Sequence, residues 1–204
     1  AHALNLIGDR WALLVVRELF FAPKRFQMIR AGLPGVTASV LTARLAQLRE
    51  AGVLTHDARL GVYRLTDAGR ALLPVLEALC RWALLMPGHD HTRFISPSAL
   101  MISMGVNLMR DQIGPGAARA GFDFGSERFT MQVDNRQITT QTADQPDAPF
   151  LLKGDGNVMA TAVYGRTPLA QLVAGDVITA EGDLAAAQEF VDMFRLEAQP
   201  ALPR

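Results

Sequence analysis

A cluster of hydrogen-bonding side chains between residues 37 and 47 has the chemistry needed to contact a nucleic acid. The cluster consists of Thr37, Ser39, Thr42, Arg44 and Gln47. Hydroxyl, guanidinium and amide groups pair with base edges and with phosphate oxygens. Three leucines recur among them at i, i+4 and i+7, which predicts a helix with one apolar stripe. The polar groups lie off that stripe, so we expect the helix to present them outward.

The elements around this cluster predict a winged helix-turn-helix. Residues 32–35 read Gly-Leu-Pro-Gly, a turn that neither neighbouring helix can continue through. A helix is expected over residues 26–31, and Thr37 is placed to cap a second helix that ends at Gly52. Strands at 53–56 and 62–65 then form a short hairpin with Arg59 at its tip. Helical domains that never meet nucleic acid also join two helices by a Gly-Pro turn, so the flanking sequence must separate the two interpretations.

The two halves of the chain carry opposite net charges. Residues 1–86 hold eleven Lys and Arg against six Asp and Glu, a net charge of +5. Residues 87–204 hold nine against fourteen, a net charge of −5, so the whole chain is neutral. A basic half with a helix-turn-helix pattern is typical of proteins that contact phosphates. The acidic half is repelled by DNA, and we expect it to have another task.

We predict that DNA contacts come from three places: the start of the first helix of the motif, the second helix, and the hairpin. Lys24, Arg25 and Arg64 are expected to anchor phosphates, while the second helix faces the major groove. The predicted DNA-binding residues are Lys24, Arg25, Thr37, Ala38, Ser39, Thr42, Ala43, Arg44, Arg59 and Arg64.

No residue pattern predicts catalysis, a cofactor or a metal site. The His residues at positions 2, 56, 89 and 91 have no evident nucleophile beside them. His89-Asp90-His91 is interpreted as a solvated loop, because two His separated by one residue make a weak metal motif. The single Cys80 excludes an intrachain disulfide and predicts a cytoplasmic protein in which Cys80 packs as a small hydrophobe. No apolar run approaches the ~20 residues of a membrane span, and no secretory leader is visible. The start at Ala1 without Met predicts an N-terminus that is either trimmed or incomplete in this sequence.

Length and pattern predict two domains in this chain of 204 residues. We assign residues 1–86 to DNA binding and dimerisation, 87–97 to a linker, and 98–204 to a second domain. Further helices are expected at 3–7, 11–21 and 67–86. Thr66 caps the last of these, and Pro74 should kink it or leave its first turn distinct. The apolar face of that helix, with Trp82, is predicted to pair two copies of the chain.

The second domain is predicted to be α+β. An apolar helix is expected over 99–113, and residues 129–133 alternate apolar and polar before a turn at Asp134-Asn135 and a strand at 137–140. Further strands are expected at 150–153 and 177–181. Helices are expected at 157–164, 167–174 and 184–194, the last capped by Asp183. The chain as a whole is therefore α+β, with a winged helix-turn-helix followed by helices that cover an antiparallel-rich sheet.

Methionine and phenylalanine are concentrated in this second domain. Six of the eight Met residues lie beyond residue 100, together with six Phe. Met repacks around varied apolar ligands, so these side chains could surround a lipophilic cavity, although an ordinary Met-rich core has the same composition. The candidate cavity residues are Met101, Met104, Phe129, Met131, Phe150, Met159 and Met193.

Residues 1–86 resemble the HxlR family of winged-helix transcription regulators. The resemblance rests on seven segments in order: 6–11 (LIGDRW), 13–19 (LLVVREL), 25–26 (RF), 33–36 (LPGV), 40–45 (VLTARL), 48–53 (LREAGV) and 63–69 (YRLTDAG). It implies DNA binding through the second helix and wing. The family often carries a redox-sensing Cys before its first helix; that position would precede Ala1, so redox sensing is not carried over to this chain from the resemblance. The hairpin is also shorter than is usual in the family.

Residues 98–196 are similar to the sterol carrier protein type 2 family. The similarity rests on 129–133 (FTMQV), 169–176 (LAQLVAGD), 181–183 (EGD) and 193–196 (MFRL). It implies an α+β fold around an apolar tunnel for lipids and acyl chains, and hence a sensor of a hydrophobic molecule.

The sequence thus predicts a homodimeric DNA-binding transcriptional regulator of the HxlR type on a pseudo-palindromic operator. Its second domain is predicted to sense a lipophilic small molecule, and no membrane contact is expected. The alternative is a DNA-binding regulator whose second domain is a structural or partner-binding module without a ligand. An enzyme is disfavoured because the sequence shows no catalytic constellation.

Overall fold

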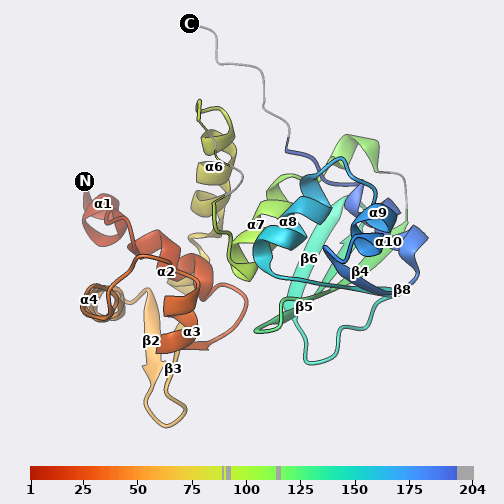
Figure 1. Ribbon diagram of the computed structural model, residues 1–204. Helices are drawn as coiled ribbons and strands as arrows, with labels where there is room; N and C mark the ends of the chain where they lie inside the picture. The colour runs from red at the N-terminus through yellow and green to blue at the C-terminus, as the bar shows by residue number, and fades with distance from the viewer. Residues whose placement is uncertain (89, 91–92, 114–115, 197–204) are drawn as a thin grey trace, which may run out of the picture. The chain divides into compact units, whose positions relative to one another are not determined.

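The computed structural model describes residues 1–88, 90, 93–113 and 116–196. The chain divides into two compact units, Ala1–Cys80 and Arg81–Arg204, drawn in Figure 1. The division falls inside one helix, α6 (Leu73–Leu84). The domain limits expected from the sequence, at residues 86 and 98, remain a prediction. His89 and His91, considered above as metal ligands, lie outside the described residues.

The first unit combines a helix-turn-helix with a three-stranded antiparallel sheet. Its elements are α1 (His2–Ile7), α2 (Ala12–Glu18), β1 (Lys24–Arg25), α3 (Phe26–Ala31), α4 (Ala38–Glu50), β2 (Leu54–Asp57), β3 (Val62–Leu65) and α5 (Asp67–Arg70). The strand order is β1-β3-β2. The predicted helices, turn and hairpin are all present, and α3 has the predicted bounds. The second helix expected from the sequence, over 11–21, is shorter and ends at Glu18.

Two details of this unit follow from local sequence. Leu41, Leu45 and Leu48 are fully buried, which confirms the apolar stripe of α4. The helix expected over 67–86 divides into α5 and α6, and Pro74 is the second residue of α6. Proline is tolerated in the first turn of a helix because the N–H it lacks has no partner within the helix there. The distinct first turn predicted from Pro74 is therefore confirmed.

The second unit is an α+β domain with a five-stranded sheet. After the end of α6 its elements are α7 (Pro97–Val106), the short 3-10 helix η1 (Arg110–Gln112), β4 (Ala117–Asp123), β5 (Arg128–Asp134), β6 (Gln137–Thr142), β7 (Phe150–Lys153), α8 (Gly156–Tyr164), α9 (Leu169–Ala174), β8 (Thr179–Gly182) and α10 (Leu184–Val191). The strand order is β6-β5-β4-β7-β8, in which the β4–β7 pair alone is parallel among the described strands. The second unit is thus α+β, and its sheet is mostly antiparallel.

One central strand of this sheet was not predicted. β4 occupies the middle of the sheet, yet its sequence AARAGFD is poor in the β-branched residues that favour strands. Gly121 explains part of this composition: a Cβ there would lie 3.0 Å from the carbonyl oxygen of Phe150 and 3.0 Å from a side-chain carbon of Leu151. The helix expected over 99–113 was also too long, since α7 ends at Val106.

The two faces of the five-stranded sheet differ. Buried side chains from β4, β5 and β7 project from one face, and α10 packs against β4 and β7 on that side; Figure 1 shows α8, α9 and α10 together there. The opposite face carries charged and polar side chains, partly covered by residues 143–149. The turn between β5 and β6 places Asn135 and Arg136 at positive φ (47° and 65°), as a tight hairpin requires, so the predicted hairpin is confirmed.

Candidate nucleic-acid interface

The turn between α3 and α4 fixes how α4 begins. Gly35 has a φ of 88°, a conformation that residues with a Cβ rarely adopt, and the Val36 N–H donates to the Leu33 carbonyl over 3.1 Å. Thr37 then adopts extended backbone, and its hydroxyl accepts from the Val40 N–H at 3.3 Å. This is the predicted N-cap, which satisfies a donor that the helix itself leaves free. The sequence therefore dictates where α4 starts.

One face of α4 is open to solvent. The exposed residues of its first two turns are Ala38, Ser39, Val40, Thr42 and Ala43, which follow the exposed Thr37. Thr42 and Arg49 are separated by seven positions, so this face continues along the helix to its last turn. The hydroxyl of Thr42 donates to the Ala38 carbonyl over 2.8 Å and keeps its oxygen lone pairs for other donors. Small and hydroxyl-bearing side chains of this kind allow a helix to approach base edges closely.

Arg44 occupies the margin of that face and is held by the protein. Its Nη2 lies 2.7 Å from the Oδ2 of Asp9, and its Nη1 donates to Gln47. Only 16% of the Arg44 side chain is exposed. The structure therefore places Arg44 against the segment between α1 and α2, whereas the sequence suggested an outward orientation.

Lys24 lies inside the first unit. Its ammonium is 3.4 Å from the carboxylate of Glu18, and both side chains are 1% exposed. Arg17 contacts the same carboxylate at 2.9 Å and also donates to the Gly32 carbonyl at 3.2 Å. A buried ammonium in this position cannot reach a phosphate, so the role of phosphate anchor that we predicted for Lys24 is wrong. Its neighbour Arg25 is exposed, because successive residues of a strand point to opposite faces.

This charge cluster also explains Gly32. The backbone of Gly32 has an ordinary φ of −76°, so no special conformation demands glycine there. A Cβ at this position would lie 2.3 Å from the Glu18 carboxylate. Gly32 therefore makes room for the buried carboxylate, and Arg17 ties the start of the turn to α2.

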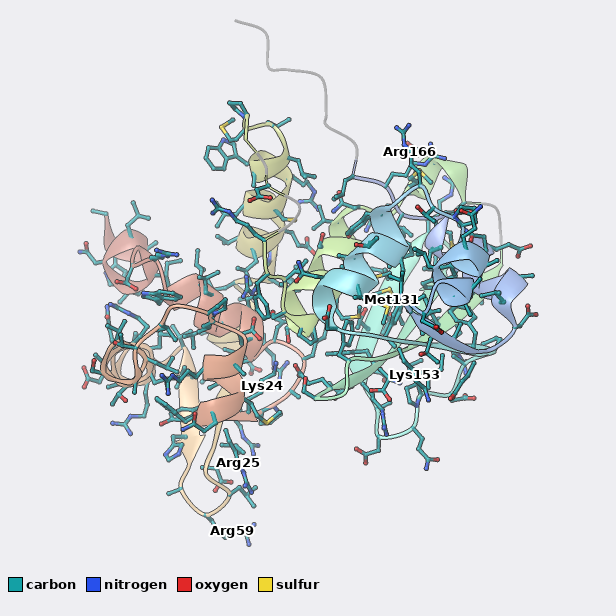
Figure 2. The ribbon with its side chains drawn as sticks, in the orientation of Figure 1. Lys24, Arg25, Arg59, Met131, Lys153 and Arg166 are labelled. Atoms are coloured by element: carbon teal, nitrogen blue, oxygen red, sulfur yellow. The ribbon has the colours of Figure 1, made fainter. Side chains whose placement is uncertain are left out.

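The wing is a tight hairpin that presents basic side chains. Asp57 Oδ1 accepts from the N–H groups of Arg59 (3.0 Å) and Leu60 (3.1 Å), which closes the turn. Arg59 and Arg64 are exposed, and the Arg64 guanidinium is 3.9 Å from Asp57. Figure 2 shows Arg59 at the tip of the β2–β3 hairpin and Arg25 beside it. Arg25 belongs to β1, which pairs with β3, so these basic groups share one region of the unit.

The sequence interpretation did not include two further basic side chains of the helix-turn-helix. Arg30 on α3 and Arg49 on α4 are exposed. Arg49 could have been found, because it lies seven positions after Thr42. Asp9, the partner of Arg44, could not have been found from spacing, because 35 positions separate the two residues.

The residues proposed to line a cavity lie in the interior of the second unit. Met101, Met104, Phe129, Met131, Phe150 and Met159 are buried, and Met193 is half-buried. Three of them, Phe129, Met131 and Phe150, are strand residues on the face of the sheet that the helices cover, and Figure 2 labels Met131. Phe122, Phe150, Phe190 and Phe194 continue this apolar region as edge-on and tilted ring contacts.

The opposite face of that sheet carries ion pairs. Arg128 Nε donates to Asp123 Oδ2 at 2.7 Å, and Lys153 lies 2.5 Å from Glu181. The Gly125 N–H, which donates to Asp123 over 2.8 Å, together with Arg128, holds the pKa of the Asp123 carboxyl below its usual value, although burial opposes this effect. In the part of the chain that the structure describes, no group of three or more His, Cys, Asp or Glu residues is placed to hold a metal ion. Nor, in that part, is any helix long and apolar enough to cross a membrane.

Comparison with known proteins identifies the first unit. The profile of the HxlR-like helix-turn-helix family matches residues 6–89. YvaP of Bacillus subtilis, an uncharacterised HTH-type transcriptional regulator, is 36% identical over 104 residues, which cover 48% of this chain and 88% of YvaP. Rv3095 of Mycobacterium tuberculosis, described in the same words, is 39% identical over 86 residues. These cover 40% of this chain and 54% of Rv3095, so this chain spans only about half the length of the mycobacterial relatives it matches.

Two solved structures complete the comparison. Quinone-bound YodB of B. subtilis shares 33% identity over 40% of this chain and 90% of its own, with a TM-score of 0.38. The sec-alkylsulfatase Pisa1 of Pseudomonas covers 95% of this chain and 29% of its own at 16% identity and a TM-score of 0.46. At these TM-scores neither likeness carries a structural argument. The identity to YvaP across most of its length, together with the family match, shows that the chain belongs to the HxlR-like helix-turn-helix family.

Proposed function

We propose that this chain is a DNA-binding transcriptional regulator that reads duplex DNA with the outer face of α4. The observation that carries the proposal is the exposed face from Thr37 to Ala43, which a capped helix presents after a rigid turn. Membership of a family whose relatives are named HTH-type transcriptional regulators supports it. These names imply that the first unit is not an enzyme, and we propose the same for the whole chain.

Within this proposal the exposed residues have separate tasks. Thr37, Ala38, Ser39, Thr42 and Ala43 face the major groove, where small and hydroxyl-bearing side chains approach base edges. Arg25, Arg59 and Arg64 contact the phosphate backbone on either side. Lys24 is left out because it is buried, and Arg44 is available only after its pair with Asp9 opens.

The proposal includes assembly as a homodimer on a pseudo-palindromic site. Val75, Leu79 and Trp82 lie on one face of α6, at i, i+4 and i+7, and all three are exposed, Trp82 by 54%. An apolar stripe of this kind on a helix is covered when a second copy packs against it. A two-fold dimer places two recognition helices one turn of DNA apart, about 34 Å.

We further propose that the second unit senses a lipophilic molecule. Its similarity to the sterol carrier protein type 2 family and the Met- and Phe-rich side of its sheet support this assignment. Residues 87–204 carry a net charge of −5, which favours neutral ligands over anionic ones. The alternative, a structural or partner-binding module, would be favoured by a second unit that binds no apolar compound.

Two matched substitutions test DNA binding. Ala43 on α4 and Ala68 on α5 are both exposed alanines in helices of the first unit. Ala43→Glu introduces a charge on the proposed groove face and is expected to abolish binding to the protein's own upstream DNA, measured by fluorescence anisotropy. Ala68→Glu adds the same charge elsewhere and should bind nearly as wild type does. Equal affinity for the two variants would refute the proposed face.

A further inference from the structure

The Asp9–Arg44 ion pair joins the second helix of the motif to the segment between α1 and α2. Asp9 Oδ2 lies 2.7 Å from Arg44 Nη2, while its Oδ1 accepts from the Trp11 N–H over 2.8 Å at the start of α2. The carboxylate is thus fixed by α2 and reaches across to α4. Because Asp9 itself is 35% exposed, the pair lies at the surface and within reach of solvent anions.

In this position all three nitrogens of the Arg44 guanidinium are engaged by the protein or buried in it. Its Nη2 faces Asp9, its Nη1 donates to Gln47, and its Nε is buried without a hydrogen-bond partner among the described residues. Reading a guanine, or gripping a phosphate at two points, requires two N–H groups of one guanidinium edge. Both Nη atoms already have an acceptor and Nε is buried, so Arg44 can present two free N–H groups of one edge to DNA only after it leaves Asp9.

The pair is also one that a phosphate can displace. A partly exposed ion pair contributes little net stability, because water solvates both charges well when they separate. The unpartnered Nε is a further weakness, because a buried donor without an acceptor is destabilising. A phosphate that takes Arg44 at the margin of α4 replaces one anion by another and allows Nε to find an acceptor.

We propose that Asp9 is a positioning residue that competes with DNA for Arg44 and so restrains the affinity of α4. This inference rests on the proposed DNA-binding function. DNA sites that contact Arg44 strongly enough to open its pair with Asp9 are bound more tightly than sites that do not. Movement of the segment between α1 and α2 shifts the carboxylate and therefore changes how readily Arg44 is released.

The test is a double-mutant cycle on DNA binding. Asp9→Asn keeps an oxygen for the Trp11 N–H and removes the charge, and Arg44→Gln removes the cation. Wild type, both single variants and the double variant are titrated with a fluorescent duplex of arbitrary sequence at several salt concentrations. Asp9→Asn is expected to tighten binding several-fold and to steepen the salt dependence by about one released counterion, a change in slope of about 0.9. In the Arg44→Gln background the same substitution should have much less effect.

Controls separate this mechanism from a general change of charge and from a loss of structure. Glu50→Gln removes an exposed carboxylate from the end of the same helix and should change binding far less than Asp9→Asn. Asp9→Ser, whose hydroxyl can also accept from Trp11, provides a second variant without the carboxylate should Asp9→Asn fail to fold. Melting temperatures show that each variant is folded.

The outcomes are distinct. The inference is overturned if Asp9→Asn binds DNA more weakly than wild type or equally well, or if Asp9→Asn gains the same affinity with and without Arg44. In either case, DNA binding by the wild type still supports the proposed function. Absence of binding by wild type and Asp9→Asn alike overturns both.

Discussion

The ammonium of Lys24 and the carboxylate of Glu18 lie 3.4 Å apart, and each side chain is 1% exposed, although the next residue, Arg25, is open to solvent. One basic residue of the Lys24–Arg25 pair therefore belongs to the interior and the other to the surface. Charge alone cannot distinguish them, but variants can.

We expect Lys24→Met to affect the stability of the fold and Arg25→Met to affect the affinity for DNA. Lys24→Met should lower the free energy of unfolding by about 2–3 kcal/mol, below the ~3–5 kcal/mol for a buried charge that loses its only partner, because Arg17 still contacts Glu18. Arg25→Met should change stability by no more than about 0.5 kcal/mol, as is usual for surface positions, and weaken DNA binding. Urea unfolding and anisotropy measure the two effects. Similar stability losses in both variants would contradict the assignment.

The wing gives a prediction about salt. Arg59→Ala should lower affinity for all sequences alike, and the slope of log K against log salt should fall in magnitude by about 0.9, the amount expected for one lost phosphate contact. A loss confined to one operator sequence would show instead that Arg59 reads bases. Leu60→Ala, at the neighbouring exposed position, is the matched control and should leave the slope unchanged.

Assembly is predicted to depend on the apolar stripe of α6. Trp82→Asp places a charge in that stripe and should give a monomer by multi-angle light scattering at micromolar concentration, because burying an unpaired carboxylate opposes association. Trp82→Phe keeps an apolar ring and should remain dimeric. A wild-type mass equal to that of one chain would disprove the dimer without recourse to either variant.

The ionisation of Asp123 should make the free energy of unfolding depend on pH. The hydrogen bond from Gly125 and the pair with Arg128 hold its pKa below the ordinary value of about 3.9, so the folded state stabilises the ionised form. That contribution is present above the ordinary pKa and is lost as the pH falls through the lowered pKa. Asp123→Asn should therefore be about 1.5–3 kcal/mol less stable than wild type at pH 7, the range for a hydrogen bond to a charged group. The difference should shrink below about pH 4; a constant difference from pH 7 to pH 2 would show that ionisation is not involved.

A ligand that binds the second unit should raise the melting temperature of the chain and change its affinity for DNA. In a thermal-shift screen of the intact chain, sterols, acyl chains and aromatic compounds are the probes. A compound at 100 times its Kd should add about 2.7 kcal/mol of stability. It should also change DNA affinity, because coupling between two binding sites is reciprocal. If no probe stabilises the chain and solvent extracts of the purified protein contain no apolar compound, the second unit is better described as a structural or partner-binding module.

Local sequence predicted those features that depend on neighbouring residues. The cap at Thr37, the hairpin turn at Asn135 and the cap of α10 by Asp183 each involve residues within a few positions of one another. The apolar period of α4 similarly identified its buried and exposed faces.

The features that sequence analysis missed depend on distant residues. β4 is a strand because β5 and β7 pair with it on either side, not because its own alanines and glycine favour one. Lys24 is buried where it pairs with the carboxylate of Glu18, which is itself buried beside Gly32. Arg44 turns inward because it pairs with Asp9. Residue type identified both cations as candidate DNA contacts, whereas tertiary packing decided which way each one points.

The parallel pairing of β4 with β7 has a kinetic consequence. Gly121 pairs with Leu151, 30 positions later along the chain, and the β5–β6 hairpin lies between them. Contacts between distant residues require a large loss of chain entropy before they form, so they slow folding relative to local turns and helices. During refolding, amide protons of β7 and β8 should become protected after those of the β5–β6 hairpin. During synthesis the apolar face of the sheet therefore stays uncovered until α10, which ends at Val191 and packs against β4 and β7, has been added, and we expect the chain to be prone to aggregate in that interval.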